Sequence, residues 1–377
     1  MEAVKDPSMA NAEPPIESAS EGKRRLSVPL WLWPVLALIV LVCGVVGIEY
    51  LQWNGEAQAG KIFGFSSFLK LENIVNILNQ YSYVGIVAIG MTFIITSANI
   101  DLSAGSLLAL LSIAGLMIVN WVVVGEAADG SKVVQYETAG VLLGLLAMIV
   151  IGCAAGGLNG FLVSKGRIAS FIVTLGGFAA YRSIALFLAE GGEVTYGGGG
   201  AFKWLGNTGL DIPGTNIARR GDPVPLEFPF AILIWLGVAV LAWVLLNKTR
   251  FGRYTIAVGA NEKAALYSAV PVKTVKTLVF VLMGGLVGLA SFMYASRLNS
   301  VSSGGSGMLL ELDAIAAVVV GGTRLAGGRG TIAGTVLGVL ILGVITNMLT
   351  ILSIDANLQG LVKGGVIVLA VLIQKKT

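Results

Sequence analysis

Residues 74–98 read IVNILNQYSYVGIVAIGMTFIITSA, and residues 102–124 read LSAGSLLALLSIAGLMIVNWVVV. An α-helix needs about 20 predominantly apolar residues to cross the roughly 30 Å hydrocarbon core of a bilayer, and each block is long enough. Only Asn99, Ile100 and Asp101 separate the two blocks. Polar or irregular backbone at membrane depth is tolerated where protein or a water-filled cavity surrounds it. The stretch therefore predicts two membrane helices joined by a short polar break.

Similar apolar blocks follow one another along the chain, at 30–51, 74–98, 102–124, 139–163, 168–189, 229–246, 276–296, 309–322, 331–352 and 358–374. Of the 377 residues, 55% are hydrophobic and 12% are charged, whereas a soluble domain carries about 25% charged residues. The block at 309–322 is short for a full crossing. We therefore predict an all-α polytopic membrane protein with about ten transmembrane helices, some of them broken or half-spanning.

The N-terminal segment 1–27 is rich in Glu, Ser, Pro and Ala and has no hydrophobic periodicity, which predicts a disordered cytoplasmic tail. Residues 28–377 are then expected to form one transmembrane domain. The segment 28–51 follows a basic triplet at 23–25 but is too long for a signal peptide and has no small-x-small cleavage site. We expect it to be retained as the first helix.

Lysines and arginines gather in alternate segments between the apolar blocks. If the N-terminal tail is cytoplasmic, the segments on that side hold 16 of them: Lys5, Lys23, Arg24, Arg25, Lys165, Arg167, Lys248, Arg250, Arg253, Lys263, Lys273, Lys276, Arg324, Arg329, Lys375 and Lys376. The opposite segments hold seven: Lys61, Lys70, Lys132, Lys203, Arg219, Arg220 and Arg297. Cytoplasmic loops of membrane proteins carry such an excess, so both termini are expected in the cytoplasm. The net charge of +4 comes from these loops and does not indicate nucleic acid.

Several kinds of chemistry are excluded by composition. The chain has no histidine and two cysteines, Cys43 and Cys153, each inside an apolar block. This excludes a disulfide framework, histidine-ligated metals and Ser-His catalysis. The stretch GRGTIAG at 328–334 lacks the glycine spacing of a dinucleotide fingerprint, and no Gly-Lys-Ser/Thr motif occurs. We therefore expect no enzyme activity and no cofactor in this chain, and no ATP hydrolysis by it alone.

Two halves of the chain show related patterns. NIDLSAGS at 99–106 opens the third block, and ELDAIAA at 311–317 opens the eighth. Glycines recur every four residues in the fourth and ninth blocks, as Gly152, Gly156 and Gly160 and as Gly330, Gly334 and Gly338. Such small residues let helix backbones pack closely in lipid. An offset of five spans inverts the second copy, so spans 2–5 and 7–10 are predicted to form inverted repeats.

Acidic and polar side chains at the two interruptions are candidates for a translocation path or gate: Asn99, Asp101, Ser103, Glu311 and Asp313. Ionisable groups in membrane segments are costly and are functional candidates by default. An alternative is structural, because Asp101 or Ser103 can cap the third helix, and acids stabilise the first turn of a helix. If these acids instead carry a proton or sodium, the chain would be an ion-coupled secondary transporter.

The longest inside loop, 247–276, contains the sequence GANEKAALYS at 259–268. Asn261 can cap a short helix that ends at Ser268. The small face formed by Ala264 and Ala265 suits docking into the groove of a partner protein, whereas the alternative is a solvated basic loop. The outside segment 190–228 is long and Gly-rich. It is either a docking surface for an extracytoplasmic protein or a variable insertion.

Taken together, several motifs resemble the permease subunits of bacterial ATP-binding-cassette (ABC) importers for ribose, xylose and related monosaccharides. These motifs are IDLSAGS at 100–106, ASFIVTL at 169–175, TRFGR at 249–253, GANEKAA at 259–265 and ELDAIAAVVVGGT at 311–323, followed by GGRG at 327–330. The resemblance covers about residues 73–374. Ala104 stands where the family usually has Val, and the segment 190–228 is longer than in ribose-type members.

The resemblance implies import of a monosaccharide, a pentose such as ribose or xylose, across the bacterial inner membrane by alternating access. It implies a second permease subunit in a homodimer or heterodimer, a cytoplasmic ABC ATPase that binds the ATP, and a periplasmic sugar-binding protein. It also implies a coupling helix seated on the ATPase, made from Gly259, Asn261, Glu262, Ala264, Ala265 and Ser268.

Overall fold

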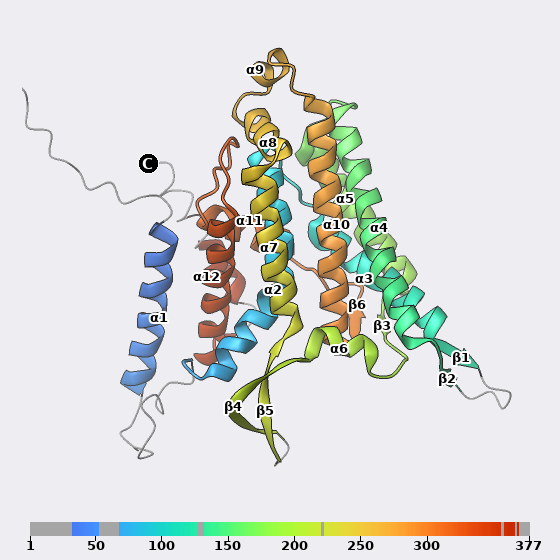
Figure 1. Ribbon diagram of the computed structural model, residues 1–377, viewed down its shortest axis with the longest axis vertical. Helices are drawn as coiled ribbons and strands as arrows, with labels where there is room; N and C mark the ends of the chain where they lie inside the picture. Colours follow the sequence, from blue (N-terminus) through green and yellow to red (C-terminus); the bar gives the residue numbers. More distant parts are fainter. Residues whose placement is uncertain are drawn as a thin grey trace, which may run out of the picture.

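A computed structural model describes residues 32–52, 68–126, 132–219, 222–355, 358–365 and 368 of the chain. The predicted tail at 1–27 lies outside these residues. The described chain is mostly helical (Figure 1). Seven of its helices are long and apolar enough to cross a membrane: α2 Leu71–Thr96, α3 Ala104–Val123, α4 Glu137–Ser164, α5 Ser170–Leu188, α7 Phe230–Lys248, α10 Val272–Leu298 and α12 Ile332–Ile351.

The remaining helices are α1 Leu32–Gln52, α6 Ala201–Asn207, α8 Arg250–Ala260, α9 Glu262–Tyr267 and α11 Leu310–Val320. Residues 358–365 are also helical. The predicted number of about ten transmembrane helices is not confirmed, because seven meet the length and hydropathy of a full span. With 11 residues, α11 rises only about 16 Å at about 1.5 Å per residue. It corresponds to the short block predicted at 309–322.

Three two-stranded antiparallel ribbons were not predicted from the sequence. They pair β1 Val124–Glu126 with β2 Lys132–Val134, β3 Glu193–Thr195 with β6 Ser300–Ser302, and β4 Gly209–Arg219 with β5 Asp222–Pro229. All three lie at the end of the bundle opposite α9, as Figure 1 shows. The ribbons and α6 occupy the segments between long helices, so the transmembrane bundle itself is all-α.

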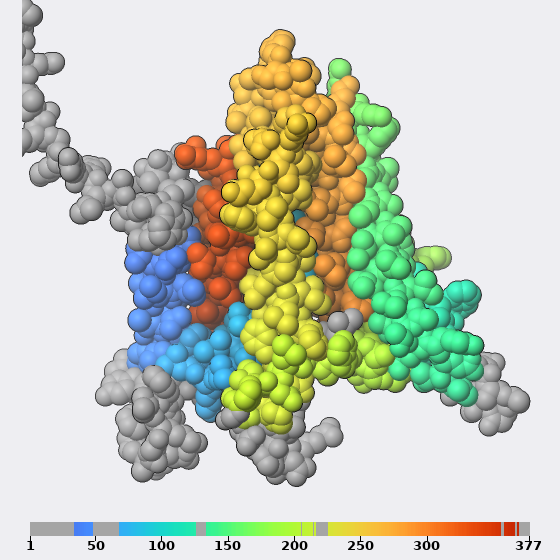
Figure 2. Space-filling model, in the orientation of Figure 1, coloured from blue at the N-terminus to red at the C-terminus, as the bar shows by residue number. Residues whose placement is uncertain are grey.

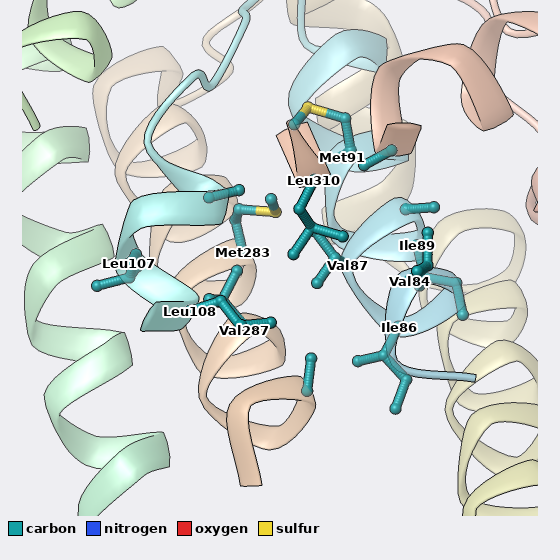
Figure 3. Packing of buried hydrophobic residues seen from close by; sticks show 14 of the residues in the cluster. Val84, Ile86, Val87, Ile89, Met91, Leu107, Leu108, Met283, Val287 and Leu310 are labelled. Atoms are coloured by element: carbon teal, nitrogen blue, oxygen red, sulfur yellow. The ribbon is translucent and has the colours of Figure 1, made fainter. Parts of the chain in front are cut away.

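The centre of the bundle is formed by α2, which is buried without interruption from Val84 to Thr96. A helix that is apolar on every side belongs inside a protein or a membrane rather than on a wet surface. Figure 3 shows side chains from α2, α3, α10 and the start of α11 converging in one cluster. By contrast, α4, α5 and α7 keep large apolar side chains exposed along most of their length, which suits contact with lipid.

The glycines of α4 lie against the backbone of α10. A side chain at Gly152 would collide with the Gly284 carbonyl oxygen, and one at Gly284 would collide with the Gly152 carbonyl. A side chain at Gly156 or at Gly160 would also collide with the α10 backbone, at Phe280 and Thr277 respectively. In lipid, where apolar side chains give little driving force for association, such close backbone packing holds helices together.

The second glycine stripe has different neighbours. Gly334 and Gly338 of α12 lie against the backbone of α11 and its C-cap, and Gly330 lies against Thr96 of α2. If the halves are inverted copies, α12 corresponds to α4, but the first stripe packs on α10 rather than on α3. The glycines of α4 that do lie against α3 are Gly140 and Gly144, next to Val123 and Val119. The glycine spacing suggested that the two stripes are equivalent, but the stripes do not contact equivalent helices.

Candidate functional site

The polar break between α2 and α3 starts where α2 ends. Ala98 has a φ of +57°, the Asn99 N–H donates to the Ile94 carbonyl, and the Ala98 N–H donates to the Ile95 carbonyl. This is a Schellman motif, which usually places glycine at the left-handed position. Alanine there costs about 1–2 kcal/mol. The chain then runs without regular structure to α3, whose N-cap is Ser103.

A network of buried polar side chains surrounds this break. The Ser103 N–H and hydroxyl both donate to the Asp101 Oδ1, at 2.8 and 2.6 Å. The Asn159 amide of α4 donates to the Ser103 Oγ at 3.2 Å, and the Tyr181 hydroxyl of α5 donates to the Asn159 Oδ1 at 3.2 Å. All four side chains are buried. Buried polar groups are stable only when hydrogen-bonded, so this network fixes the start of α3 to α4 and α5.

The starts of α3 and α11 meet inside the bundle. A side chain at Gly105 would collide with the Gly307 carbonyl and with the Glu311 carboxylate, and one at Gly307 would collide with the Gly105 carbonyl. Each helix N-terminus carries roughly half a positive charge. The Glu311 carboxylate lies where these two positive ends converge, and its charge offsets their repulsion.

Glu311 is also incompletely bonded. Its side chain belongs to a residue that is 6% exposed, and its Oε2 has no hydrogen-bond partner among the described residues. The charge of Arg182 of α5 acts on this carboxylate. Arg182 itself donates to the carbonyls of Ser303 and Ser306, at 2.8 and 2.9 Å. The guanidinium therefore ties α5 to the turn that precedes α11.

Asp313 lies apart from this centre. Its Oδ2 is 2.9 Å from the Nζ of Lys363, which stands in the helical residues 358–365. Four of the five candidate path residues thus gather around the two helix starts, whereas the fifth, Asp313, is ion-paired with Lys363. Sequence reasoning did not include Asn159 and Tyr181. Their signal was a pair of polar side chains inside otherwise apolar blocks.

The short helix predicted between Asn261 and Ser268 is observed as α9. The Asn261 Oδ1 accepts a hydrogen bond from the Ala264 N–H at 3.0 Å, which is the expected N-cap. Ser268 is the C-cap. Glu262 forms an ion pair of 2.7 Å with Lys276 of α10. Figure 2 shows α9 protruding from its end of the bundle.

The exposed face of α9 differs from the expected one. Ala265 is 5% exposed and packs inward, so it cannot form an outward docking face together with Ala264. Leu266 and Tyr267 are instead 62% and 89% exposed. Exposed apolar side chains of this size are typical of interaction sites.

Gly259, at the end of α8, connects α9 to the bundle. A side chain there would collide with the carbonyl oxygen of Thr96, the last residue of α2. The same carbonyl accepts a hydrogen bond of 2.9 Å from the Gly328 N–H in the loop between α11 and α12. The ends of α2 and α8 and this loop therefore form one joint beside the polar break.

The structure defines the class of protein. Two helices that start inside an apolar bundle, with polar groups gathered at their ends, are the arrangement found at the binding sites of membrane transporters. Among the described residues, no group of three or more acids, histidines or cysteines is arranged to hold a metal. The fold and the site are those of a polytopic membrane transport protein.

The chain belongs to the family described as branched-chain amino acid transport system / permease component, whose model matches residues 73–371. It is 42% identical over 311 residues to the ribose import permease protein RbsC of Bacillus subtilis, covering 82% of this chain and 87% of that protein. It is 36% identical over 357 residues to RbsC of Escherichia coli K12, covering 94% and 97%. It is 33% identical over 350 residues to the xylose transport system permease protein XylH of Haemophilus influenzae, covering 81% and 89%. No solved structure matches the chain. The resemblance to monosaccharide permeases drawn from the sequence motifs is confirmed.

Proposed function

We propose that this chain is the membrane-spanning permease subunit of an ABC importer that moves a pentose, ribose or xylose, into the cell. The observation that carries the proposal is its similarity to a ribose import permease over 94% of its own length. The chain is not an enzyme in this proposal, and it binds no cofactor. ATP is bound and hydrolysed by a separate ATPase subunit.

We place the chain in the bacterial inner membrane, with the α9 end in the cytoplasm and the ribbon end in the periplasm. The loops at the α9 end carry most of the lysines and arginines, which supports this orientation. With α1, α11 and the C-terminal helix counted, about ten helices would cross or enter the membrane and both termini would be cytoplasmic.

Helix packing supports inverted repeats, with α2 to α5 equivalent to α10, α11, α12 and the C-terminal helix. α10 packs against α4 and α3, just as α2 packs against α12 and α11. The pairs α3–α4 and α11–α12 correspond in the same way. Two inverted halves that rock about a shared centre provide alternating access. The glycines of α4 and α12 act in this proposal as packing residues that keep each half rigid.

The transport path is proposed to run beside the two helix starts. Asn99, Asp101 and Ser103 lie on one of these starts, Glu311 lies on the other, and Asp313 flanks it. Asn99, Asp101 and Ser103 are buried in hydrogen-bonded groups, which supports a closed gate in this conformation. When the halves rock, the contact between Gly105 and Gly307 is where the path would open.

Coupling to the ATPase is assigned to α9, whose exposed Leu266 and Tyr267 would insert into a groove of that subunit. Asn261 and Ser268 cap this helix, Glu262 ties it to α10, and Gly259 packs it against α2. Movement of α9 would therefore reach the polar break through backbone contacts.

Two further partners complete the proposed importer. A second permease subunit, identical or related, would pack in the membrane beside this one, and a periplasmic sugar-binding protein would dock at the ribbon end. The segment 190–228 contains β3, α6, β4 and most of β5. This gives it a folded surface on which a binding protein could rest.

A test of this function uses the chain purified together with its ATPase subunit. Binding protein loaded with ribose or xylose should stimulate ATP hydrolysis several-fold above the level with sugar-free binding protein. Stimulation by a branched-chain amino acid binding protein, with none by either pentose, would assign the chain to another substrate class.

A further inference from the structure

A cavity of about 600 Å³ lies beside α9, between the end of α4, the start of α5 and the start of α10. Its inner end is lined by Asn99 and Ser164, which are only 5% and 6% exposed. Sites for small molecules commonly measure about 300–1,000 Å³. The cavity therefore has the size of a ligand site and a floor of buried polar groups.

Basic side chains converge on this cavity from two directions. Arg167 reaches it from the turn between α4 and α5, and Lys273 and Lys276 reach it from α10. Glu262 is the one acid among its described lining residues and is already paired with Lys276. Arg167 and Lys273 have no ion pair within the described part of the chain. Two positive charges at the cavity are therefore uncompensated.

The N-terminus of α5 adds further positive potential to the same cavity. Ala169 and Ser170, which begin this helix, line the cavity. No side chain caps the first N–H groups of α5, and its first turn has no acid. A helix N-terminus with free N–H groups attracts phosphate through its dipole and its hydrogen-bond donors. Two exposed cations without an ion pair and a helix N-terminus thus line one half-open cavity.

The positive-inside rule explains why cations occur at this end of the bundle. It does not require that they meet at a cavity with a buried polar floor. A neutral sugar would gain nothing from two uncompensated charges, whereas a phosphate group would bind the forked donors of Arg167 and the point charge of Lys273. We propose that this cavity is a binding site for a phosphate group, carried by a small molecule that enters from the α9 end. The site is independent of the sugar that is transported.

The full chain in phosphatidylcholine nanodiscs tests this proposal through its thermal unfolding midpoint. We expect a saturable rise in the midpoint with inorganic phosphate and a larger one with ribose 5-phosphate, and none with ribose. Arg167→Gln and Lys273→Gln should each weaken the apparent affinity about tenfold. Lys263→Gln is the matched control, because Lys263 is exposed on α9 and does not line the cavity.

A second set of measurements distinguishes a phosphate group carried by a free small molecule from one carried by a lipid headgroup. In nanodiscs that contain phosphatidylglycerol, a free-phosphate site keeps its response to ribose 5-phosphate. A rise with phosphatidylglycerol that Arg167→Gln abolishes, together with no response to ribose 5-phosphate, would assign the phosphate group to lipid and overturn the small-molecule source. No response to any of these probes, or equal responses in all three variants, would overturn the site itself.

Discussion

Individual glycines set the distance between α4 and α10. Gly156 lies so close to the carbonyl of Phe280 that no side chain fits, whereas a side chain at Gly157 would meet the Val281 Cγ2 at 3.5 Å. The two glycines are neighbours on the same helix and differ only in what they face. They therefore form a matched pair for testing whether backbone packing holds this bundle.

Gly156→Ala is expected to destabilise the protein by about 2–3 kcal/mol, because a methyl group against a backbone carbonyl forces the helices apart. Gly157→Ala should change stability by less than about 1 kcal/mol, since its contact is an ordinary one. Denaturant unfolding in detergent measures both. Equal effects of the two substitutions would show that α4 and α10 are not held by this seam.

Substitutions at Asp101 distinguish a structural role of this acid from a role as a proton carrier. Asn keeps an oxygen that can accept the bonds from Ser103, so Asp101→Asn should keep pentose uptake within about threefold of wild type. Asp101→Ala should destabilise the break by about 1–3 kcal/mol, because it leaves buried donors without a partner. If Asp101→Asn abolished uptake as fully as Asp101→Ala, the acid would carry a proton and the ion-coupled alternative would gain support.

At the scale of helices, the apolar blocks predicted where most helices lie, because each long block must satisfy its own backbone in lipid. The polar break was also predictable, since Asn99 and Asp101 interrupt apolar sequence. Two of the ribbons were not predictable because β1, β2, β3 and β6 have three residues each. In addition, β3 pairs with β6 from a distant part of the chain. The number of about ten helices stays a prediction, because seven helices among the described residues are long and apolar enough to cross a membrane. The short block at 309–322 was recognisable from its length, and it is observed as α11.

Some features of the site depend on contacts between distant helices, which the sequence alone does not reveal. Spacing identified the glycines but not their partners, so Gly152 and Gly334 were matched although they face different helices. The cap at Asn261 followed from local sequence alone. The inward orientation of Ala265 did not, because it depends on where α9 leans against α10.

The exposed end of α9 should be a contact with the ATPase. Tyr267→Ala is expected to lower the affinity for that subunit at least about tenfold, because exposed aromatic side chains dominate such interfaces. Its own stability should not change, since Tyr267 is 89% exposed. Tyr136→Ala is the control, because Tyr136 is 76% exposed at the ribbon end. Co-purification of the ATPase with each variant measures the effect, and equal retention by both would remove α9 from the interface.

The Tyr196 side chain helps to anchor the ribbon end to α4. The Tyr196 hydroxyl donates to the Glu137 Oε1 at 2.6 Å. Burial, followed by this bond and the charge of Glu137, raises the pKa of Tyr196 above its ordinary value. Tyrosine in the unfolded chain ionises at about pH 10. The stabilisation that the bond provides is therefore complete below that pH, and it is lost as the pH rises towards the higher pKa of the folded state.

Tyr196→Phe should lower stability at neutral pH by about 1–2 kcal/mol. It should also flatten the loss of stability between about pH 10 and 11 that the wild type shows. Thermal unfolding midpoints measured from pH 7 to pH 11 report both effects. An alkaline loss of the same size in wild type and variant would mean that other groups cause it.

The two ends of the molecule carry different structural features. The α9 end carries the exposed Leu266 and Tyr267, most of the loop cations and the basic cavity, whereas the opposite end carries α6 and the three ribbons. Between them, α2 runs through the centre and ends at Thr96, where the joint with Gly259 and Gly328 meets the polar break. In the proposed function, these backbone contacts would link the ATPase-binding end to the polar break.

Pentose uptake into proteoliposomes tests this account most directly. The vesicles contain the chain with its ATPase, hold ATP inside on the α9 side, and receive sugar-loaded binding protein outside. The account predicts uptake that requires hydrolysable ATP and continues when ionophores collapse the proton and sodium gradients. Uptake driven by an imposed proton or sodium gradient, in vesicles that contain this chain without any ATPase, would contradict it.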